Sequence, residues 1–95
     1  METRTFKFQF SKKVSFHEAS ATLILSRIAA ESLHGVDRVA FEFEATLNKT
    51  ERFILITAKG QAGYDMALMF RGFTRREFGS SEVTATHEKA PVINP

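Results

Sequence analysis

The sequence of 95 residues contains no cysteine and no tryptophan, and it has a single tyrosine. Without cysteine the chain cannot form disulfides, offer a thiolate nucleophile or build a cysteine-ligated zinc or iron–sulfur site. Secreted domains of this size often depend on disulfides, so their absence favours a reducing compartment. We therefore expect a cytoplasmic protein.

Long apolar runs and a strong charge of one sign are also lacking. No run of apolar residues approaches the length of a membrane span, and the first ten residues mix charges with phenylalanines, unlike a signal peptide. We expect no membrane association. The formal net charge is +2, which permits nucleic-acid binding without arguing for it, because dedicated binders usually carry a dense basic stripe.

The residues that are present are those of a small globular domain. Hydrophobic residues make up 43% of the chain and charged residues 25%, which is typical of a soluble fold. We predict one domain over residues 1–89, followed by a flexible C-terminal tail over residues 90–95. A domain this small has a thin margin of stability, and binding a second copy is one way to widen it.

Periodicity and capping signals predict four strands and two helices. Alternating apolar and polar residues predict strands over residues 3–10, 39–47, 52–59 and 81–87. Helices are predicted over residues 16–34 and 61–78. Ser15 and Glu18 form the pattern of a capping box at the start of the first helix, and Gly35 and Gly79 suit the positions that close the two helices.

The order of these elements predicts an α+β fold. Right-handed crossovers in a βαββαβ chain place both helices on one face of a four-stranded antiparallel sheet. We expect this ferredoxin-like, two-layer sandwich with the spatial strand order 4-1-3-2. The arrangement serves enzymes, RNA binders, metal carriers and regulatory domains alike, so the fold does not select a function.

The predicted faces of the sheet differ in polarity. The side chains expected to face the helices are Phe6, Phe8, Phe10, Val39, Phe41, Phe43, Ile54, Ile56, Ala58, Val83 and Ala85. The open face is polar except for Phe53 and Leu55. These two residues would either join an interface or be covered by the tail through Val92 and Ile93.

Both helices carry more apolar residues than one buried stripe requires. The predicted core stripe of the first helix is Ala21, Ile24, Leu25 and Ile28, at the spacing of one helical face. The predicted core stripe of the second is Ala62, Met66, Met69, Phe70 and Phe73. Opposite the latter lies a row composed of Tyr64, Leu68, Arg71 and Arg75. Because Tyr and Arg are enriched in interfaces, we predict that this row, together with Phe53 and Leu55, forms one.

These features favour an oligomerisation or protein-interaction module, and we expect a homodimer. The alternative is a nucleic-acid-associated protein. Its phosphate contacts would come from Arg71, Arg75 and Arg76 in the second helix and from Lys12 and Lys13 in the first loop. Such contacts position a nucleic acid without reading its bases, so we expect any binding to be weak.

Catalytic and cofactor signals are weak. His17, His34 and His87 lack metal-ligand spacing. Glu42 and Glu44 are predicted on one face of a strand, where they would keep an edge soluble. The segment of residues 59–63 joins a strand to a helix start but matches neither a P-loop nor a dinucleotide fingerprint. The sequence therefore favours binding over catalysis, and we assign no catalytic residue, metal or cofactor. An enzyme with its site formed between subunits is the third and least favoured alternative.

Overall fold

A computed structural model of the chain describes residues 2–89, and within them four strands alternate with three helices. The strands are β1 (Arg4–Phe10), β2 (Phe43–Asn48), β3 (Phe53–Ala58) and β4 (Val83–Lys89). The helices are α1 (Phe16–His34), α2 (Val36–Glu42) and α3 (Gln61–Phe78). The tail predicted for residues 90–95, including Val92 and Ile93, lies outside the described residues.

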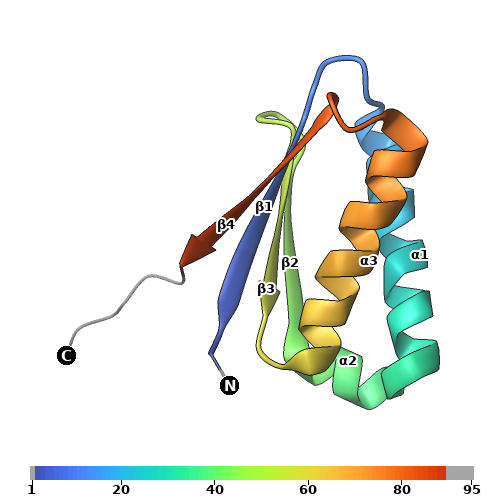
Figure 1. Cartoon of the computed structure of the whole chain (residues 1–95), viewed down its shortest axis with the longest axis vertical. Coiled ribbons are helices and arrows are strands. Elements are labelled where there is room, and N and C mark those ends of the chain that lie inside the picture. Colours follow the sequence, from blue (N-terminus) through green and yellow to red (C-terminus); the bar gives the residue numbers. More distant parts are fainter. Residues whose placement is uncertain (1, 90–95) are drawn as a thin grey trace.

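The strands form one antiparallel sheet in the order β2-β3-β1-β4. This is the order predicted from the sequence, with β2 and β4 at the two edges. All helices lie on the same side of the sheet, and α1 packs along α3 (Figure 1). The predicted helix signals are confirmed: the Ser15 hydroxyl accepts a hydrogen bond from the amide of Glu18, and Gly35 and Gly79 have φ angles of 89° and 94°.

A third helix, α2, replaces the start of the predicted second strand. Residues 39–42 are helical, and the strand begins only at Phe43. Arg38 and Glu42 form an ion pair of 2.9 Å across one turn of α2, an interaction that supports a helix. Val39 is buried as predicted, but the prediction that Phe41 faces the helices is wrong, because 82% of this residue is exposed.

The core lies between the sheet and α3. The rings of Phe8 and Phe70 meet edge to face with 4.8 Å between their centroids, and Phe10 meets Phe16 in the same way at 6.2 Å. Such edge-to-face contacts are favoured by the charge distribution of aromatic rings. The residues on the predicted helix-facing side of β1, β3 and β4 are buried or half-buried, so the faces of these strands are confirmed.

The junction of α2 and β2 packs against the start of α3. The Glu42 side chain accepts a hydrogen bond of 3.1 Å from the amide of Ala62, which satisfies one of the free amides at a helix start. A Cβ atom on Gly60 or Gly63 would overlap Glu42. The two glycines therefore allow this close approach, and a carboxylate of the chain itself occupies the helix start. Glu42 and Glu44 do not share a strand, contrary to the prediction.

Candidate interaction surface

Helix α1 turns most of its branched apolar residues away from the core. Ile24, Leu25 and Ile28 are exposed by 61%, 60% and 53%, and Ala21 is exposed beside them. The prediction that these four residues form the core stripe is therefore wrong. We call them the outer stripe of α1. The buried residues of this helix are Phe16, Ala19, Thr22, Leu23, Ser26 and Ala30.

Small and hydroxyl side chains explain why α1 packs in this orientation. Ala19, Ser26 and Ala30 are short, so the backbones of α1 and α3 can approach closely. The Ser26 hydroxyl donates to the carbonyl of Thr22, and the Thr22 hydroxyl donates to a carboxylate oxygen of Glu77 at 2.6 Å. These bonds remove the cost of burying the two hydroxyl groups. The prediction for α1 assigned the larger apolar side chains to the core because it considered hydrophobicity alone. It did not consider how closely the helix packs on α3, and for this reason it was wrong.

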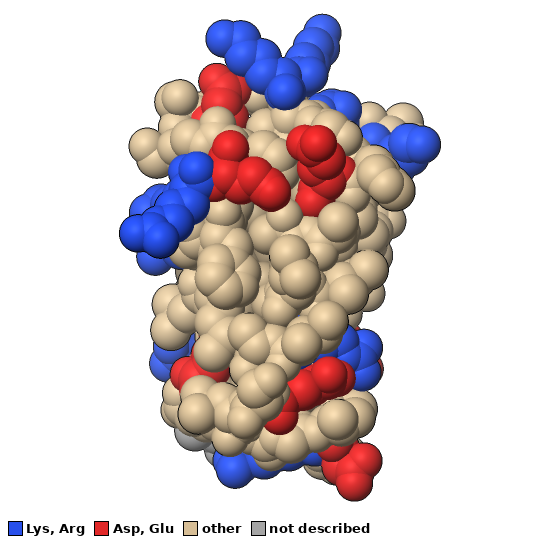
Figure 2. Space-filling view, turned by 90° about the vertical axis from the view of Figure 1, so that its right-hand side faces the viewer, with Lys and Arg blue, Asp and Glu red and all other residues tan. Residues whose placement is uncertain are grey.

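The exposed apolar surface extends beyond α1. Phe73 of α3 is 41% exposed, which corrects its prediction as a core residue, whereas Ala62, Met66 and Phe70 are buried as predicted and Met69 is half-buried. Further exposed apolar residues lie near the other end of α1, namely Leu33, Val36 and Phe41. Figure 2 shows a broad area without Lys, Arg, Asp or Glu across the middle of the helical side of the molecule, with charges gathered toward its two ends.

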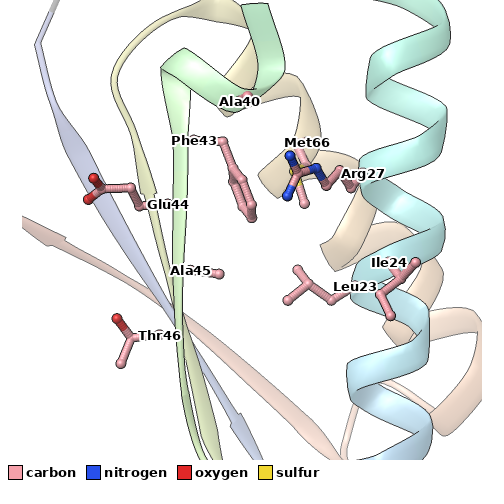
Figure 3. A pocket seen from close by; sticks show the side chains of 9 residues that line it. All are labelled: Leu23, Ile24, Arg27, Ala40, Phe43, Glu44, Ala45, Thr46 and Met66. Carbon is pink, nitrogen blue, oxygen red and sulfur yellow. The ribbon is translucent and has the colours of Figure 1, made fainter. Parts of the chain in front are cut away.

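Two hollows flank the outer stripe. A groove of about 540 Å³ lies between α1 and the edge strand β2 (Figure 3). Its lining consists of Leu23, Ile24, Arg27, Ala40, Phe43, Glu44, Ala45, Thr46 and Met66. A second hollow of about 480 Å³ lies toward α3, where Leu25 and Phe73 contribute apolar surface. The outer stripe is thus a ridge between two depressions.

Two of the charged groups near the outer stripe, Arg27 and Glu77, have partners within the chain. Arg27 and Glu31 form an ion pair of 3.1 Å along α1. Glu77 accepts the hydrogen bond from Thr22. Covering the stripe would therefore leave Arg27 with its ion-pair partner and Glu77 with a hydrogen-bond donor, which lowers the electrostatic cost of an interface.

The predicted row on α3 is brought together, but part of it has contacts within the chain. The Tyr64 hydroxyl donates to the backbone carbonyl of Glu2, and the Arg4 guanidinium lies 5.3 Å from the centre of the tyrosine ring. Leu68 is exposed and lines a hollow of about 150 Å³ together with Arg71.

The open face of the sheet carries Phe53 and Leu55, as predicted, and both are half-buried. The Lys7 ammonium lies 4.6 Å from the centre of the Phe53 ring, a distance typical of a cation–π contact. In addition, Lys59 pairs with Glu44 at 2.9 Å. Part of the apolar surface predicted here is thus covered by a neighbouring lysine.

The basic residues of the nucleic-acid alternative do not form one surface. Arg71 lines the hollow on the side of β1 and β4, whereas Arg76 lines the hollow beside α1, on the opposite flank of α3. Arg75 is exposed in the last turn of α3, and Lys12 and Lys13 are exposed in the loop before α1. A single phosphate backbone would reach only part of this set.

Only His34 of the three histidines is bonded to a carboxylate, as far as residues 2–89 are described. Its Nε2 atom lies 2.7 Å from a carboxylate oxygen of Asp65, and this contact ties the end of α1 to the N-terminal part of α3. The hydrogen bond from His34 lowers the pKa of Asp65 below its ordinary value, and one from Gln61 acts in the same direction. The hydrogen bond from Arg38 likewise lowers the pKa of Glu42. Sequence spacing gave no signal for the His34–Asp65 pair, because 31 positions separate its members.

The described residues contain no group of three or more His, Cys, Asp or Glu side chains placed to hold a metal ion. Nor does the described part of the chain include a helix with the length and apolar character needed to cross a membrane. Comparisons with models of known protein families, with curated proteins and with solved structures find no match for this chain.

Proposed function

We propose that the protein is an oligomerisation module that forms a homodimer through the outer stripe of α1. The observation that carries this proposal is the outward position of Ile24, Leu25 and Ile28 on a helix whose opposite face is already packed. A contiguous exposed apolar patch of this kind is typical of interaction sites. A second copy is the simplest partner, because it supplies the same ridge and the same flanking hollows.

The energy available from the stripe is moderate. Fully burying a Leu or Ile side chain stabilises by about 1.5–3 kcal/mol. Since the three residues are more than half exposed, covering them on both copies gains roughly 5–10 kcal/mol in total. Association costs about 4–15 kcal/mol before any contact is counted. The stripe alone therefore gains about as much as association costs, and additional surface is needed for a stable dimer.

The α3 row of Tyr64, Leu68, Arg71 and Arg75 remains a second predicted interface. Its tyrosine and the nearby Phe53 already have contacts within the chain, so less of this surface is available to a partner. The two surfaces are distinguished below by a pair of matched variants.

We interpret the fold as a ferredoxin-like sandwich with α2 as an addition. The antiparallel pairing and the order β2-β3-β1-β4 support this interpretation. It does not select a function, because unrelated activities share the arrangement. Cytoplasmic location remains a prediction from the lack of cysteine.

The proposal is tested by the mass in solution. Sedimentation or light scattering of the wild type at micromolar concentration should give twice the mass of one chain. Ile24→Asp should reduce this mass to that of one chain, because a charge at this position must be desolvated without a partner in the interface. Leu68→Asp is the matched control, since Leu68 has nearly the same exposed fraction, 59% against 61%.

Circular dichroism should show that both variants remain folded. A wild type that stays at the mass of one chain at high concentration would contradict the proposal. Loss of the dimer in Leu68→Asp but not in Ile24→Asp would move the interface to α3.

A further inference from the structure

Strand β2 presents an open edge. It lies at the end of the sheet and, among the described residues, pairs with no strand other than β3. Edge strands are commonly protected by charged side chains, proline or a bulge. Strand β2 contains neither lysine nor proline, and its one charged residue, Glu44, pairs with Lys59 of the same chain.

The backbone groups on the open side of β2 can be assigned. The Lys59 amide donates to the carbonyl of Glu42 at 2.8 Å, immediately before the strand begins. Bonded and non-bonded residue pairs alternate along an antiparallel ladder. The even-numbered residues of β2 therefore bond to β3, and the N–H and C=O groups of Phe43, Ala45 and Leu47 point away from it.

The space beside this edge suits a second strand and its helix. Phe43 and Ala45 point toward α1, whereas Glu44 and Thr46 point to the other side of the sheet (Figure 3). The groove between β2 and α1 has apolar side chains from both elements, including Leu23. Leu47 at the end of the strand is also 47% exposed.

We infer that β2 pairs antiparallel with β2 of a second copy, across a two-fold axis at Ala45. This inference rests on the proposed homodimer and specifies how its copies meet. The side chains favour this register over one centred on Glu44. Centring the pair on Ala45 places Phe43 opposite the partner's Leu47, and Glu44 opposite the partner's Thr46. Centring it on Glu44 would place two carboxylates directly opposite each other, which is destabilising.

The same axis also brings the two α1 helices together. Ile24 lines the groove beside β2, so the outer stripe of α1 borders the side on which the second copy would lie, and the two-fold axis keeps both α1 helices on the same face of the joined sheet. An isologous contact then pairs the outer stripe with its own copy. Two four-stranded sheets become one continuous sheet, and the groove of each copy is closed by the helix of the other.

Two proline variants test the pairing. Ala45→Pro removes an amide that points to the open side and leaves the bonds to β3 in place, so proline is tolerated there as in other edge strands. Ala85→Pro is the matched control on β4. The Ser11 amide donates to the carbonyl of Glu82 at 3.0 Å, so the Ala85 amide also points outward by the same alternation. Light scattering should show that Ala45→Pro halves the mass and that Ala85→Pro leaves the dimer intact.

A cross-linking experiment keeps the test decisive if Ala45→Pro fails to fold. The chain has no cysteine, so Ala45→Cys introduces one thiol per copy. Directly opposed, hydrogen-bonded residues have Cα atoms about 5.5 Å apart, within the range of a disulfide. Mild oxidation or a short thiol cross-linker should convert Ala45→Cys to a covalent dimer, and Ala85→Cys should remain monomeric in denaturing electrophoresis.

The outcomes separate the two claims. A dimer that persists in Ala45→Pro, or an Ala45→Cys dimer that does not cross-link, overturns the strand pairing and leaves the proposed homodimer standing. A wild type with the mass of one chain overturns the homodimer itself.

Discussion

Replacing Gly63 by alanine should destabilise the protein, although alanine favours helices more than glycine does. A Cβ atom at this position would overlap the carbonyl oxygen of Glu42 and lie 2.9 Å from the Cα atom of Ala58, whereas carbon atoms normally stay about 3.5 Å apart. Both neighbours belong to the backbone and cannot rotate away. We expect about 3 kcal/mol of overpacking cost, the upper end of the usual range.

The gain in helix propensity offsets about 1 kcal/mol of this cost. The net loss is therefore about 2 kcal/mol, which lowers the Tm of a domain of this size by roughly 8–16 °C. Gly72 provides the control, because it lies in the same helix and a Cβ atom there would meet nothing within 4 Å. Gly72→Ala should raise the Tm by roughly 4–8 °C.

Thermal unfolding followed by circular dichroism, at one protein concentration for all samples, measures both shifts. A Gly63→Ala variant as stable as the wild type would refute the close packing of the α2–β2 junction on α3. Without this close packing, the contact between Glu42 and α3 would no longer explain why residues 39–42 are helical.

Three further results are expected. Phe70→Asp should abolish cooperative unfolding, because it places a charge in the core of a marginally stable domain, and a folded Phe70→Asp protein would show that α3 is turned differently. The stability that Asp65 contributes should be complete above its ordinary pKa of 3.8 and be lost as the pH falls toward its lower pKa in the folded state. Asp65→Asn should therefore make acid denaturation curves less steep in this range, and identical curves would contradict the role of the His34 hydrogen bond. Binding to RNA or duplex DNA, followed by fluorescence anisotropy, should be weak and sequence-independent and should fall steeply between about 50 and 200 mM salt. Tight binding that persists at high salt would instead identify a base-reading surface.

The sequence was sufficient for most of the fold because local signals agreed with tertiary packing. The alternation in β1 and β3 predicted which side chains are buried, and the glycines after α1 and α3 marked both helix ends. Residues 39–42 were misassigned because Val39, Phe41 and Phe43 alternate as a strand would. Helix α2 ends at Glu42, whose side chain contacts the start of α3. This contact joins residues 20 positions apart, so local periodicity does not reveal it.

The candidate surface was harder to predict for a related reason. Helix α1 has apolar residues on two opposite faces, and the periodicity does not say which face is inside. The choice depends on the fit to α3, where short residues such as Ala19 and Ala30 pack more closely than Ile24 or Ile28 would. The sequence did show that α1 has two opposed apolar faces. Because only one of them can face the core, this pattern indicated that the other is exposed and open to a partner.

Isotope-filtered NMR on a mixture of ¹³C-labelled and unlabelled protein tests the central claim most directly, because it detects only contacts between copies. We predict intermolecular signals at the methyl groups of Ile24 and Ile28 and none at those of Leu68. Intermolecular signals confined to Leu68, or none at any methyl group at a concentration where the mass is that of two chains, would contradict the assignment of the outer stripe of α1 as the dimer interface.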